Sequence, residues 1–391
     1  MKHEILILGG NHQNPLGVIE ALGRKGLRSH VIVVGGCKKS FVLRSKYVKR
    51  GWICGSYEEA LSCIREQFSQ ATKPLVAYAC SDDAASFFDC HRDELSQYLL
   101  LPGIAQQGAL TRWIDKQVMV EAAQRLGLDT PRTWIVDQAS NFSEILYPCV
   151  TKSLTSVQNG KSEFTLCQNE AELRHFLQPK AHKRQIQVQQ FIEKEYEFQF
   201  LGLSLQGGEQ VFIPGRTHIG ATPHFNNITF LRYAPFAEGD NPATLEKSRA
   251  YVRATGYTGL FSVEFMHGKD GRDYFLEMNF RNDGNGICVT SAGTNLPYIF
   301  YLYATGGDYQ GEIASSEVKE TYCTPEDSYL MLMLNGEIGF KEWCKNMKRA
   351  TCYVTYFKGN TKPFWSLMWL QKRPIVATAF RRLLKTLHLA S

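Results

Sequence analysis

The N-terminal part of the chain alternates short apolar runs with amphipathic stretches. A helical pattern of apolar positions covers residues 18–26, between the first two runs. The apolar runs, each short enough for a strand, lie at residues 5–8, 31–34, 52–53 and 75–79. Alternation of strands and helices is typical of an open parallel sheet with helices on both faces. We therefore predict an α/β fold for this part of the chain.

The pattern changes after about residue 108. A helix is predicted from Trp113 through Leu126, and Gly127 suits the end of that helix. A strand at residues 147–152 precedes a loop of small polar residues at 153–162, and residues 185–189 alternate as a strand does. Residues 197–235 add further strand patterns, and together with the strands around Glu264 and Glu277 they are predicted to form a third sheet, which is antiparallel.

Two acidic residues interrupt apolar strands near the end of this sheet. Glu264 lies in Phe-Ser-Val-Glu-Phe, and Glu277 lies in Phe-Leu-Glu-Met-Asn-Phe-Arg. Residues 269–273, Lys-Asp-Gly-Arg-Asp, read as the turn of a hairpin that joins the two strands. The hairpin brings both carboxylates close to the amide oxygen of Asn279, and three hard oxygen ligands suit Mg²⁺. The alternative is a pair of outward-facing acids on an alternating strand.

Composition narrows the class of protein. With 391 residues and 44% hydrophobic content, the chain can bury more than one core. The N-terminus lacks a signal-peptide pattern and no long apolar run is present, so we expect a cytoplasmic protein. The eleven cysteines show no Cys-x-x-Cys spacing, which favours buried reduced thiols over a disulfide framework or a zinc site.

The net charge of +6 is confined to the C-terminus. Residues 362–391 carry six Lys or Arg and no acid, so the preceding chain is formally neutral. A neutral body argues against binding to nucleic acid. Residues 364–370 are apolar and aromatic, and helical spacing with basic residues follows Pro374. We expect residues 362–391 either to contact an anionic membrane at its inner face or to pack on the enzyme or on a homodimer partner.

The order of several motifs along the chain resembles that of the ATP-grasp superfamily, over about residues 1–305. Within it the chain is similar to the D-aspartate ligase-like branch of carboxylate–amine ligases. The order of the polar residues is Lys116, Lys152, Gln189-Gln190-Phe191-Ile192, Glu264, then Glu277, Asn279 and Arg281. Further support comes from residues 78–83, 92–98, 277–281 and 294–296.

The resemblance implies a domain organisation. We expect a Rossmann-like, pre-ATP-grasp domain followed by a two-lobed α+β ATP-grasp domain and a C-terminal extension with a basic amphipathic tail. In this interpretation the N-terminal domain covers residues 1–108, the small lobe 109–185, the large lobe with the metal site 186–310, and the extension 311–391.

It also implies ATP and two Mg²⁺ ions, with Mn²⁺ as an alternative ion. Lys116 and Lys152 would contact the α- and β-phosphates, because a triphosphate carries about four negative charges that need point-charge partners. The loop 153–162 would cover the phosphates. The adenine would lie near Gln189, Gln190, Phe191 and Ile192. The ribose would meet Glu197, with Glu195 as the alternative.

Three roles remain for the terminal phosphate and the metal. The expected metal ligands are Glu264, Glu277 and Asn279. Arg281 lies two residues beyond Asn279 and should reach the γ-phosphate, unless it forms a structural ion pair. Arg216 is a candidate for binding phosphate or a substrate carboxylate.

The predicted function is that of an ATP-dependent ligase. A small-molecule carboxylate would attack the γ-phosphate, and an amine would attack the resulting acyl-phosphate to form an amide. The resemblance suggests an amino acid used in cell-envelope or peptide-like metabolite synthesis. Two alternatives stay open: a nucleotide-binding regulatory or scaffold protein, and a carbamoyl-phosphate or carboxylase type of enzyme. The histidines His12, His218, His224 and His267 show no evident partner in the sequence.

Overall fold

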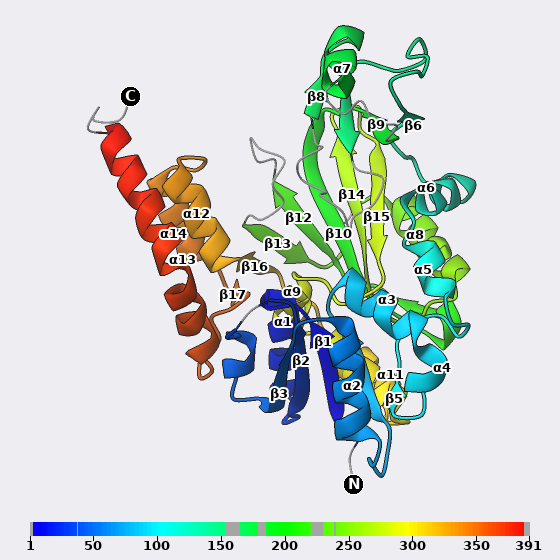
Figure 1. Cartoon of the computed structure of the whole chain (residues 1–391), viewed down its shortest axis with the longest axis vertical. Helices are drawn as coiled ribbons and strands as arrows, with labels where there is room; N and C mark the ends of the chain where they lie inside the picture. The colour runs from blue at the N-terminus through cyan, green and yellow to red at the C-terminus, as the bar shows by residue number, and fades with distance from the viewer. Residues whose placement is uncertain are drawn as a thin grey trace.

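The fold is taken from a computed structural model of the whole chain. It describes residues 3–36, 38–152, 165–178, 185–220, 230–237 and 240–386. Figure 1 shows three layers of structure stacked along the long axis, with the C-terminal helices on one side.

The N-terminal part is the predicted parallel sheet, in the order β3-β2-β1-β4-β5. Strand β1, the run Ile5–Gly9, is buried along its whole length because helices cover both faces of the sheet. The other strands are β2 (Ser29–Val34), β3 (Val48–Cys54), β4 (Leu75–Ala79) and β5 (Leu99–Leu100). The surrounding helices are α1 (Gln13–Gly23), the short turn η1 (Val42–Arg44), α2 (Tyr57–Phe68), α3 (Asp82–Cys90) and α4 (Arg92–Leu95).

Two helices occupy this region, and the second is the helix predicted from Trp113 through Leu126, which starts three residues later than predicted. They are α5 (Ala109–Trp113) and α6 (Lys116–Arg125). The carboxylate of Asp115 accepts hydrogen bonds from the backbone N–H groups of Gln117 and Val118, so it caps and starts α6. The prediction for Gly127 is confirmed, since its φ of +75° ends the helix in a left-handed conformation.

A small antiparallel sheet of four strands follows, in the order β6-β9-β7-β8. Its strands are β6 (Thr133–Val136), β7 (Cys149–Lys152), β8 (Thr165–Cys167) and β9 (Ile186–Gln190), and α7 (Glu170–Leu177) packs beside β8. The sheet has its own apolar core, which includes Val136, Phe142, Leu173 and Val188. The side chain of Lys152 and the predicted polar loop 153–162 lie outside the described residues.

The largest sheet has eight strands and contains the predicted hairpin. Its order is β15-β14-β10-β12-β13-β16-β17, with β11 paired to β10. The hairpin turn at residues 269–272 places Gly271 at a φ of +77°, which glycine adopts without strain. The strands are β10 (Lys194–Leu205), β11 (Gln210–Phe212), β12 (Arg216–Gly220), β13 (Leu231–Ala234), β14 (Gly259–Gly268), β15 (Asp273–Asn279), β16 (Thr321–Thr324) and β17 (Cys352–Tyr353), and a turn, η3 (Gln206–Gly208), joins β10 to β11.

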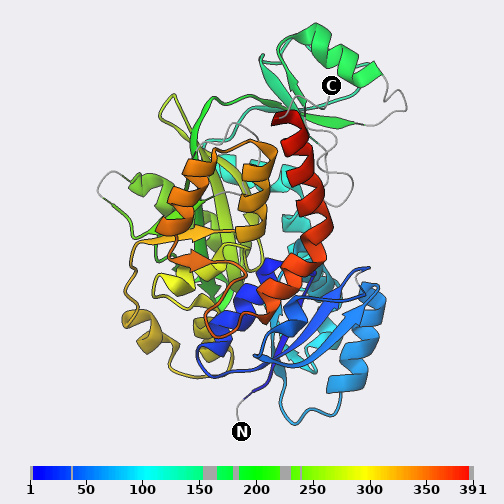
Figure 2. The ribbon, with the colours of Figure 1, turned by 90° about the vertical axis from the view of Figure 1, so that its left-hand side faces the viewer.

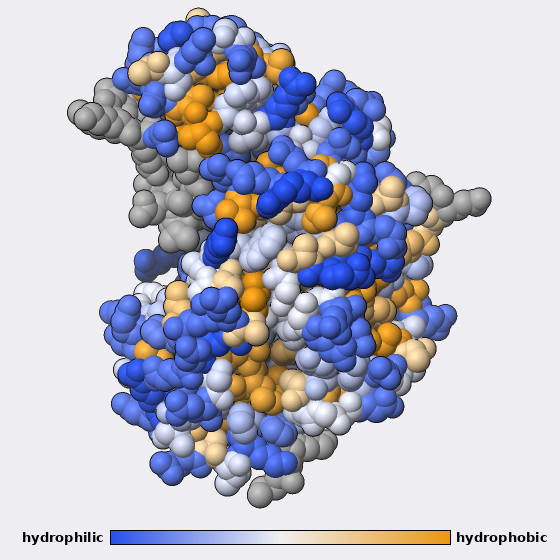
Figure 3. Space-filling model, turned by 90° about the vertical axis from the view of Figure 1, so that its right-hand side faces the viewer, coloured by the Kyte–Doolittle hydropathy of each residue, from blue (hydrophilic) through white to orange (hydrophobic). Residues whose placement is uncertain are grey.

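Helices join this sheet to the N-terminal sheet. They are α8 (Pro242–Thr255), α9 (Gly286–Ser291), α10 (Leu296–Ala304) and α11 (Tyr309–Ala314). Both α9 and α10 pack against α1, so one apolar core runs from the parallel sheet into the large sheet. On the molecular face seen in Figure 3, hydrophobic residues form patches among hydrophilic ones.

Three helices form most of the C-terminal part: α12 (Glu326–Asn335), α13 (Phe340–Arg349) and α14 (Lys362–Thr386). Helix α14 lies along the outer side of α12 (Figures 1 and 2). It runs unbroken through Pro374, whereas the sequence predicts that helical spacing starts after that proline. Leu367 and Thr378, one on each side of Pro374, are both buried, so packing on both sides holds the helix together.

A buried carboxylate fixes the C-terminal part internally. Glu326 accepts hydrogen bonds from the backbone N–H groups of Val354, Thr355 and Tyr356, at 3.2, 3.2 and 2.6 Å. Burial raises the pKa of Glu326 to about 7, although these backbone N–H groups favour the charged form and limit the rise.

We predict that Glu326 makes the protein less stable as the pH rises from about 4.5 to about 7. The folded state holds the Glu326 proton more tightly than the unfolded state, so the stabilisation is full below the unfolded pKa and is lost as the pH passes the folded pKa. The change amounts to about 3 kcal/mol of unfolding free energy. Urea unfolding at several pH values should show this slope in the wild type and a smaller one in Glu326→Gln. Glu342→Gln, at an exposed site on α13, is the control, and equal slopes in all three proteins would contradict the prediction.

Candidate functional site

The two acidic residues of the hairpin face each other across adjacent strands. Glu264 on β14 is the register partner of Glu277 on β15, and Ser262 is the partner of Asn279. A register shift follows Glu264, because Phe265 pairs with Phe275 and Leu276 is left as an extra residue. Register therefore sets the two carboxylates directly opposite each other, as the spacing in the sequence predicts.

Two side-chain amides orient the Glu264 carboxylate. Asn279 Nδ2 and Gln199 Nε2 both donate to Glu264 Oε1, each at 3.0 Å. Asn285 Nδ2 in turn donates to Gln199 Oε1 at 3.0 Å, so the chain of hydrogen bonds extends to the residue that precedes α9. The sequence analysis missed Gln199 because it reaches Glu264 only through the register between β10 and β14.

Electrostatics make this pair unfavourable when no cation is present. Burial raises the pKa of Glu264 well above its usual range, and the neighbouring carboxylates of Glu277 and Asp283 raise it further. A divalent cation between these oxygens would reverse the repulsion, so the donor set fits Mg²⁺. Asn279 Oδ1 accepts a hydrogen bond from Arg281 Nη2 at 3.0 Å and keeps a second lone pair.

A cavity of about 200 Å³ lies next to the hairpin. It brings together four of the predicted site residues, from α6, β9, β14 and β15. Its lining consists of Lys116, Met119, Val120, Gln187, Gln189, Glu264, Leu276 and Glu277. Residues separated by more than a hundred positions in sequence thus share one cavity.

Gln187 is a cavity residue that the sequence analysis missed. It is buried, and its Oε1 has no hydrogen-bond partner among the described residues. A buried acceptor without a donor costs about 1–3 kcal/mol, so this atom suits a donor group on a bound molecule. The signal was present in the sequence, because Gln187 and Gln189 share one face of an alternating strand.

The predicted adenine-binding residues lie where the small sheet meets the large one. Gln189 Nε2 donates to Thr133 Oγ1 at 3.3 Å, and Gln190 Oε1 accepts from the backbone N–H of Arg132 at 3.4 Å. Ile192 is buried. The backbone N–H of Phe191 donates to the carbonyl of Pro148 at 3.1 Å, so this donor already has a partner within the protein.

Glu197 and Glu195, the alternatives for the ribose, differ in environment. Glu197 is buried and forms an ion pair with Lys194 at 2.7 Å, while Glu195 is exposed. Glu197 lies two residues before Gln199 on β10 and acts electrostatically on Glu264. The geometry therefore favours Glu197 over Glu195 as a group that faces the cavity region.

The two predicted phosphate-binding lysines belong to different elements, Lys116 to α6 and Lys152 to β7. Lys116, the first residue of α6, lines the cavity. The backbone of Lys152 pairs with Gln187, a residue that also lines the cavity. The expected phosphate contact of the Lys152 side chain falls outside the described residues.

Arg281 is held by carboxylates from two parts of the chain. Its Nε donates to Asp82 Oδ1 at 3.0 Å, and its Nη1 lies 3.4 Å from Asp283 Oδ2. Burial lowers the pKa of Arg281, but Asp82 and Asp283 outweigh burial and raise it. Asp82 belongs to the first turn of α3, so the contact joins the N-terminal sheet to the hairpin.

Arg216, His218 and His267 lie on the large sheet, whereas His224 lies outside the described residues. Arg216 forms an ion pair with Asp240, and its guanidinium lies 5.2 Å from the centre of the Phe198 ring. The expectation that His267 lacks a partner is wrong, since its Nδ1 lies 2.7 Å from Asp273 Oδ1. Asp273 is the register partner of His267, and both residues lie beside the turn of the hairpin. His12 also has a partner: its Nδ1 accepts from a backbone N–H and so caps α1.

Comparisons with known proteins show what the chain is similar to in sequence and in fold. Residues 121–295 match the model of the ATP-grasp domain. An L-amino acid ligase from Bacillus licheniformis shares the fold with a TM-score of 0.64 at 18% identity, covering 82% of this chain and 79% of the other. A biotin carboxylase from Campylobacter jejuni does so with a TM-score of 0.61 at 16% identity, over 81% of this chain and 74% of the other.

Two relatives are similar in sequence. A D-aspartate ligase of Enterococcus faecium (strain Aus0004) is 22% identical over 268 residues, which is 61% of each chain. A formate-dependent phosphoribosylglycinamide formyltransferase of Anaeromyxobacter dehalogenans (strain 2CP-C) is 31% identical over 186 residues, which is 44% of this chain and 46% of the relative. The aligned part thus spans about three fifths of the ligase and under half of the formyltransferase.

The fold class and the site together define a mixed α/β protein with a parallel N-terminal sheet and an acidic hairpin beside a lysine-lined cavity. Residues 121–295 of this chain, under half of its length, are similar to the ATP-grasp domain.

We predict that Glu277→Gln changes stability in opposite directions with and without ligand. Without cation, the substitution removes repulsion from Glu264 and should raise the free energy of unfolding by about 1 kcal/mol. With Mg²⁺ and ATP at about a hundred times the dissociation constant, the wild type should gain about 2.7 kcal/mol and the variant much less. Thermal unfolding with each ligand alone and together measures both effects. Glu195→Gln, at an exposed site on β10, should behave as the wild type; an equal ligand response in Glu277→Gln would contradict the prediction.

Proposed function

We propose that this protein is an ATP-dependent carboxylate–amine ligase that forms an amide through an acyl-phosphate. The observation that carries the proposal is the pair Glu264 and Glu277, facing each other in one cavity with Lys116. Carboxylates opposite a lysine suit a triphosphate bound through divalent cations.

Each residue of the cavity then has a part in binding or alignment. Glu264 and Glu277, with Asn279, would hold the two Mg²⁺ ions, and when bound these ions would supply positive charge near the transferring phosphoryl group. Lys116 and Lys152 would contact phosphate oxygens, and Arg281, which the structure holds between Asp82 and Asp283, would reach the terminal phosphate from there. Gln187, Gln189 and the residues Gln190–Ile192 surround the base, and Glu197 meets the ribose.

The reaction needs no nucleophile from the protein. A carboxylate oxygen of the substrate attacks the γ-phosphorus, and the bond from that phosphorus to the β,γ-bridging oxygen breaks to release ADP. The amine nitrogen then attacks the acyl carbon, the carbon–oxygen bond to phosphate breaks, and the amine loses a proton to solvent. The side chains supply charge and alignment, and such electrostatic preorganisation is the main catalytic term in reactions of this kind.

We propose an amino acid as the carboxylate substrate. Support comes from the similarity to a D-aspartate ligase and from the fold shared with an L-amino acid ligase. Envelope or peptide-like metabolite synthesis is the class of process that such a ligase would serve. In this proposal residues 1–108, 109–185, 186–310 and 311–391 act as the N-terminal domain, small lobe, large lobe and extension.

A panel assay separates this proposal from its alternatives. We expect ADP release that requires both an amino acid and an amine acceptor, tested with D- and L-amino acids. The double variant Glu264→Ala/Glu277→Ala should lose at least about a hundredfold in kcat, while Glu195→Gln should keep its rate. Nucleotide binding without turnover on any substrate would indicate a regulatory protein. Bicarbonate-dependent ADP release would indicate a carboxylase or carbamoyl-phosphate type of enzyme.

We also propose that helix α14 holds the enzyme against an anionic membrane surface. One side of α14 packs on α12, while Trp365, Trp369, Val376 and Phe380 on the other side are each 57% to 66% exposed. Their spacing places them along one face of the helix. Figure 2 shows α14 running along the outside of the molecule, on the side that faces the viewer.

The charge of α14 indicates which kind of surface its apolar face would bind. Lys362, Lys372 and Arg373 are exposed on α14, and the helix carries no acid. Lys372 Nζ lies 4.4 Å from the centre of the Trp369 ring, so basic and aromatic groups share one surface. This combination suits the headgroup region of an anionic bilayer. No helix in the described part of the chain combines the length and the apolarity that crossing a bilayer requires.

We predict that the protein sediments with phosphatidylglycerol vesicles and not with phosphatidylcholine vesicles. Trp365→Ala/Trp369→Ala, and separately Lys372→Glu/Arg373→Glu, should weaken this partition roughly tenfold or more, because each basic residue contributes about 1 kcal/mol. Ile135→Ser removes an exposed apolar side chain from the small sheet and should leave binding unchanged. Undiminished binding in both double variants would contradict the proposal. So would a loss of self-association in the tryptophan variant, because the face would then bind a second copy.

A further inference from the structure

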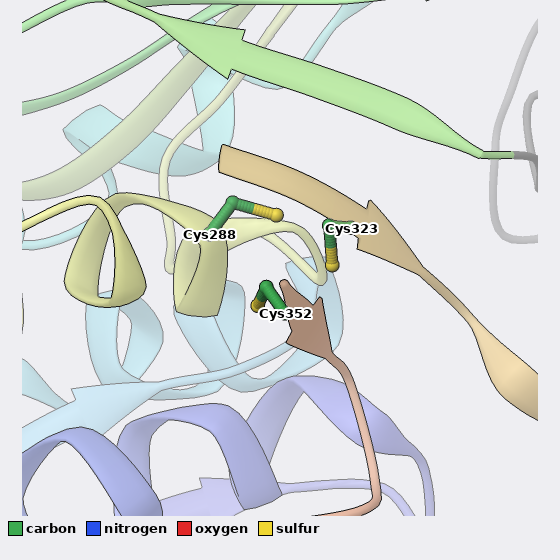
Figure 4. A group of neighbouring side chains, drawn as sticks. All are labelled: Cys288, Cys323 and Cys352. Carbon is green, nitrogen blue, oxygen red and sulfur yellow. The ribbon is translucent and has the colours of Figure 1, made fainter. Parts of the chain in front are cut away.

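Three cysteines that are far apart in sequence meet in the interior. Cys288 comes from α9, Cys323 from β16 and Cys352 from β17, and their Sγ atoms all lie within 4.8 Å of one another. Figure 4 shows the three side chains converging on one small space between a helix and two strands. All three are free thiols and nearly inaccessible, at 0%, 0% and 3% exposure.

The fold fixes these thiols from independent directions. Cys323 and Cys352 are register partners on adjacent parallel strands, so the sheet sets their separation. Cys288 is brought to them by α9, which follows directly on the acidic hairpin and packs against both strands. The cluster therefore lies where the C-terminal part joins the rest of the protein.

Polar groups around the cluster distinguish it from thiols packed as ordinary apolar residues. The hydroxyl of Tyr233 is fully buried and has no hydrogen-bond partner among the described residues, and Tyr233 is close enough to Cys288 to interact with it electrostatically. Arg24 acts on Cys352 in the same way and donates to Ser291 Oγ at 3.3 Å. The cluster thus has an unpaired buried hydroxyl and a nearby cation as polar neighbours, whereas burial raises the pKa of the Cys288 thiol.

The sulfur geometry suits a single metal ion. Metal–sulfur bonds of about 2.3 Å around one ion place thiolate sulfurs about 4 Å apart, so a small inward movement of the side chains is enough. Thiolate ligands select soft ions with a filled d shell, such as Zn²⁺ and Cu⁺. A dry pocket with three sulfurs suits such an ion better than a hard cation that keeps its waters.

We propose that Cys288, Cys323 and Cys352 bind one thiophilic d¹⁰ metal ion, Zn²⁺ or Cu⁺, that fastens the C-terminal part to the body of the protein. On binding, three S–H bonds break, three metal–sulfur bonds form, and three protons pass to solvent. No electron is transferred in this step. The site is separate from the acidic hairpin, so the proposal does not depend on the ligase activity.

The first test measures metal in the full-length protein. The wild type, expressed with added Zn²⁺ or Cu⁺ and purified without chelator, should carry about one metal ion for each chain by mass spectrometry of metals. Cys323→Ala/Cys352→Ala should hold at least about tenfold less. The control is Cys149→Ala/Cys167→Ala, which removes another cross-strand pair of buried thiols from the small sheet and should keep the metal.

A second measurement on the wild type needs no variant to fold. Protein unfolded under reducing conditions and refolded with Cd²⁺ should show sulfur-to-cadmium charge-transfer absorption, and unfold at a higher temperature than protein refolded with chelator. If the wild type carries no metal as purified and shows no such absorption after refolding with Cd²⁺, the thiols only pack together. That result would overturn the proposal. A mass lower by two hydrogens, indicating a disulfide between two of the thiols, would overturn it as well. Equal metal content in the Cys323/Cys352 double variant would place the ion elsewhere.

Discussion

Two negative charges held face to face are the constraint on which the site depends. Glu264 and Glu277 repel each other across β14 and β15, and the sheet does not let them separate, because their positions are fixed by backbone register. Amide donors from Asn279 and Gln199 offset part of this repulsion. The register shift keeps both acids on one face of the sheet. The result is a site whose electrostatic energy is lowered only when positive charge arrives.

The rest of the molecule gathers complementary groups around that pair. Helix α6 contributes Lys116 to the cavity, and β9 contributes Gln187 and Gln189 from the small sheet. Arg281, beyond the end of the hairpin, donates to Asn279 Oδ1. The apolar core that joins α1 to α9 and α10 keeps the N-terminal sheet beside the large one. The three layers of the fold thus serve mainly to bring polar residues from distant parts of the chain into one cavity.

Local patterns predicted the parallel sheet, the hairpin and the pairing of Glu264 with Glu277, because each depends on strand alternation and turn chemistry within a short segment. Gln199 and Asp82 were missed because strand register and sheet packing bring them to the site from distant segments. The start of α6 was predicted three residues too early, because the helical pattern includes Trp113 while the Asp115 cap starts the helix at Lys116. Helix α14 passes through Pro374 because packing on α12 outweighs local preference, which the sequence pattern does not contain.

The ion pair between Arg281 and Asp82 has a consequence for how molecules enter and leave. It ties the N-terminal sheet to the hairpin by a partly buried charge, so swinging those two bodies apart would leave the guanidinium with fewer partners in a poorly solvated place. The small sheet has an apolar core of its own and contributes no residue to that ion pair. We therefore expect the cavity to open at the lowest free-energy cost on the side of β9 and the small sheet, and molecules to enter and leave there.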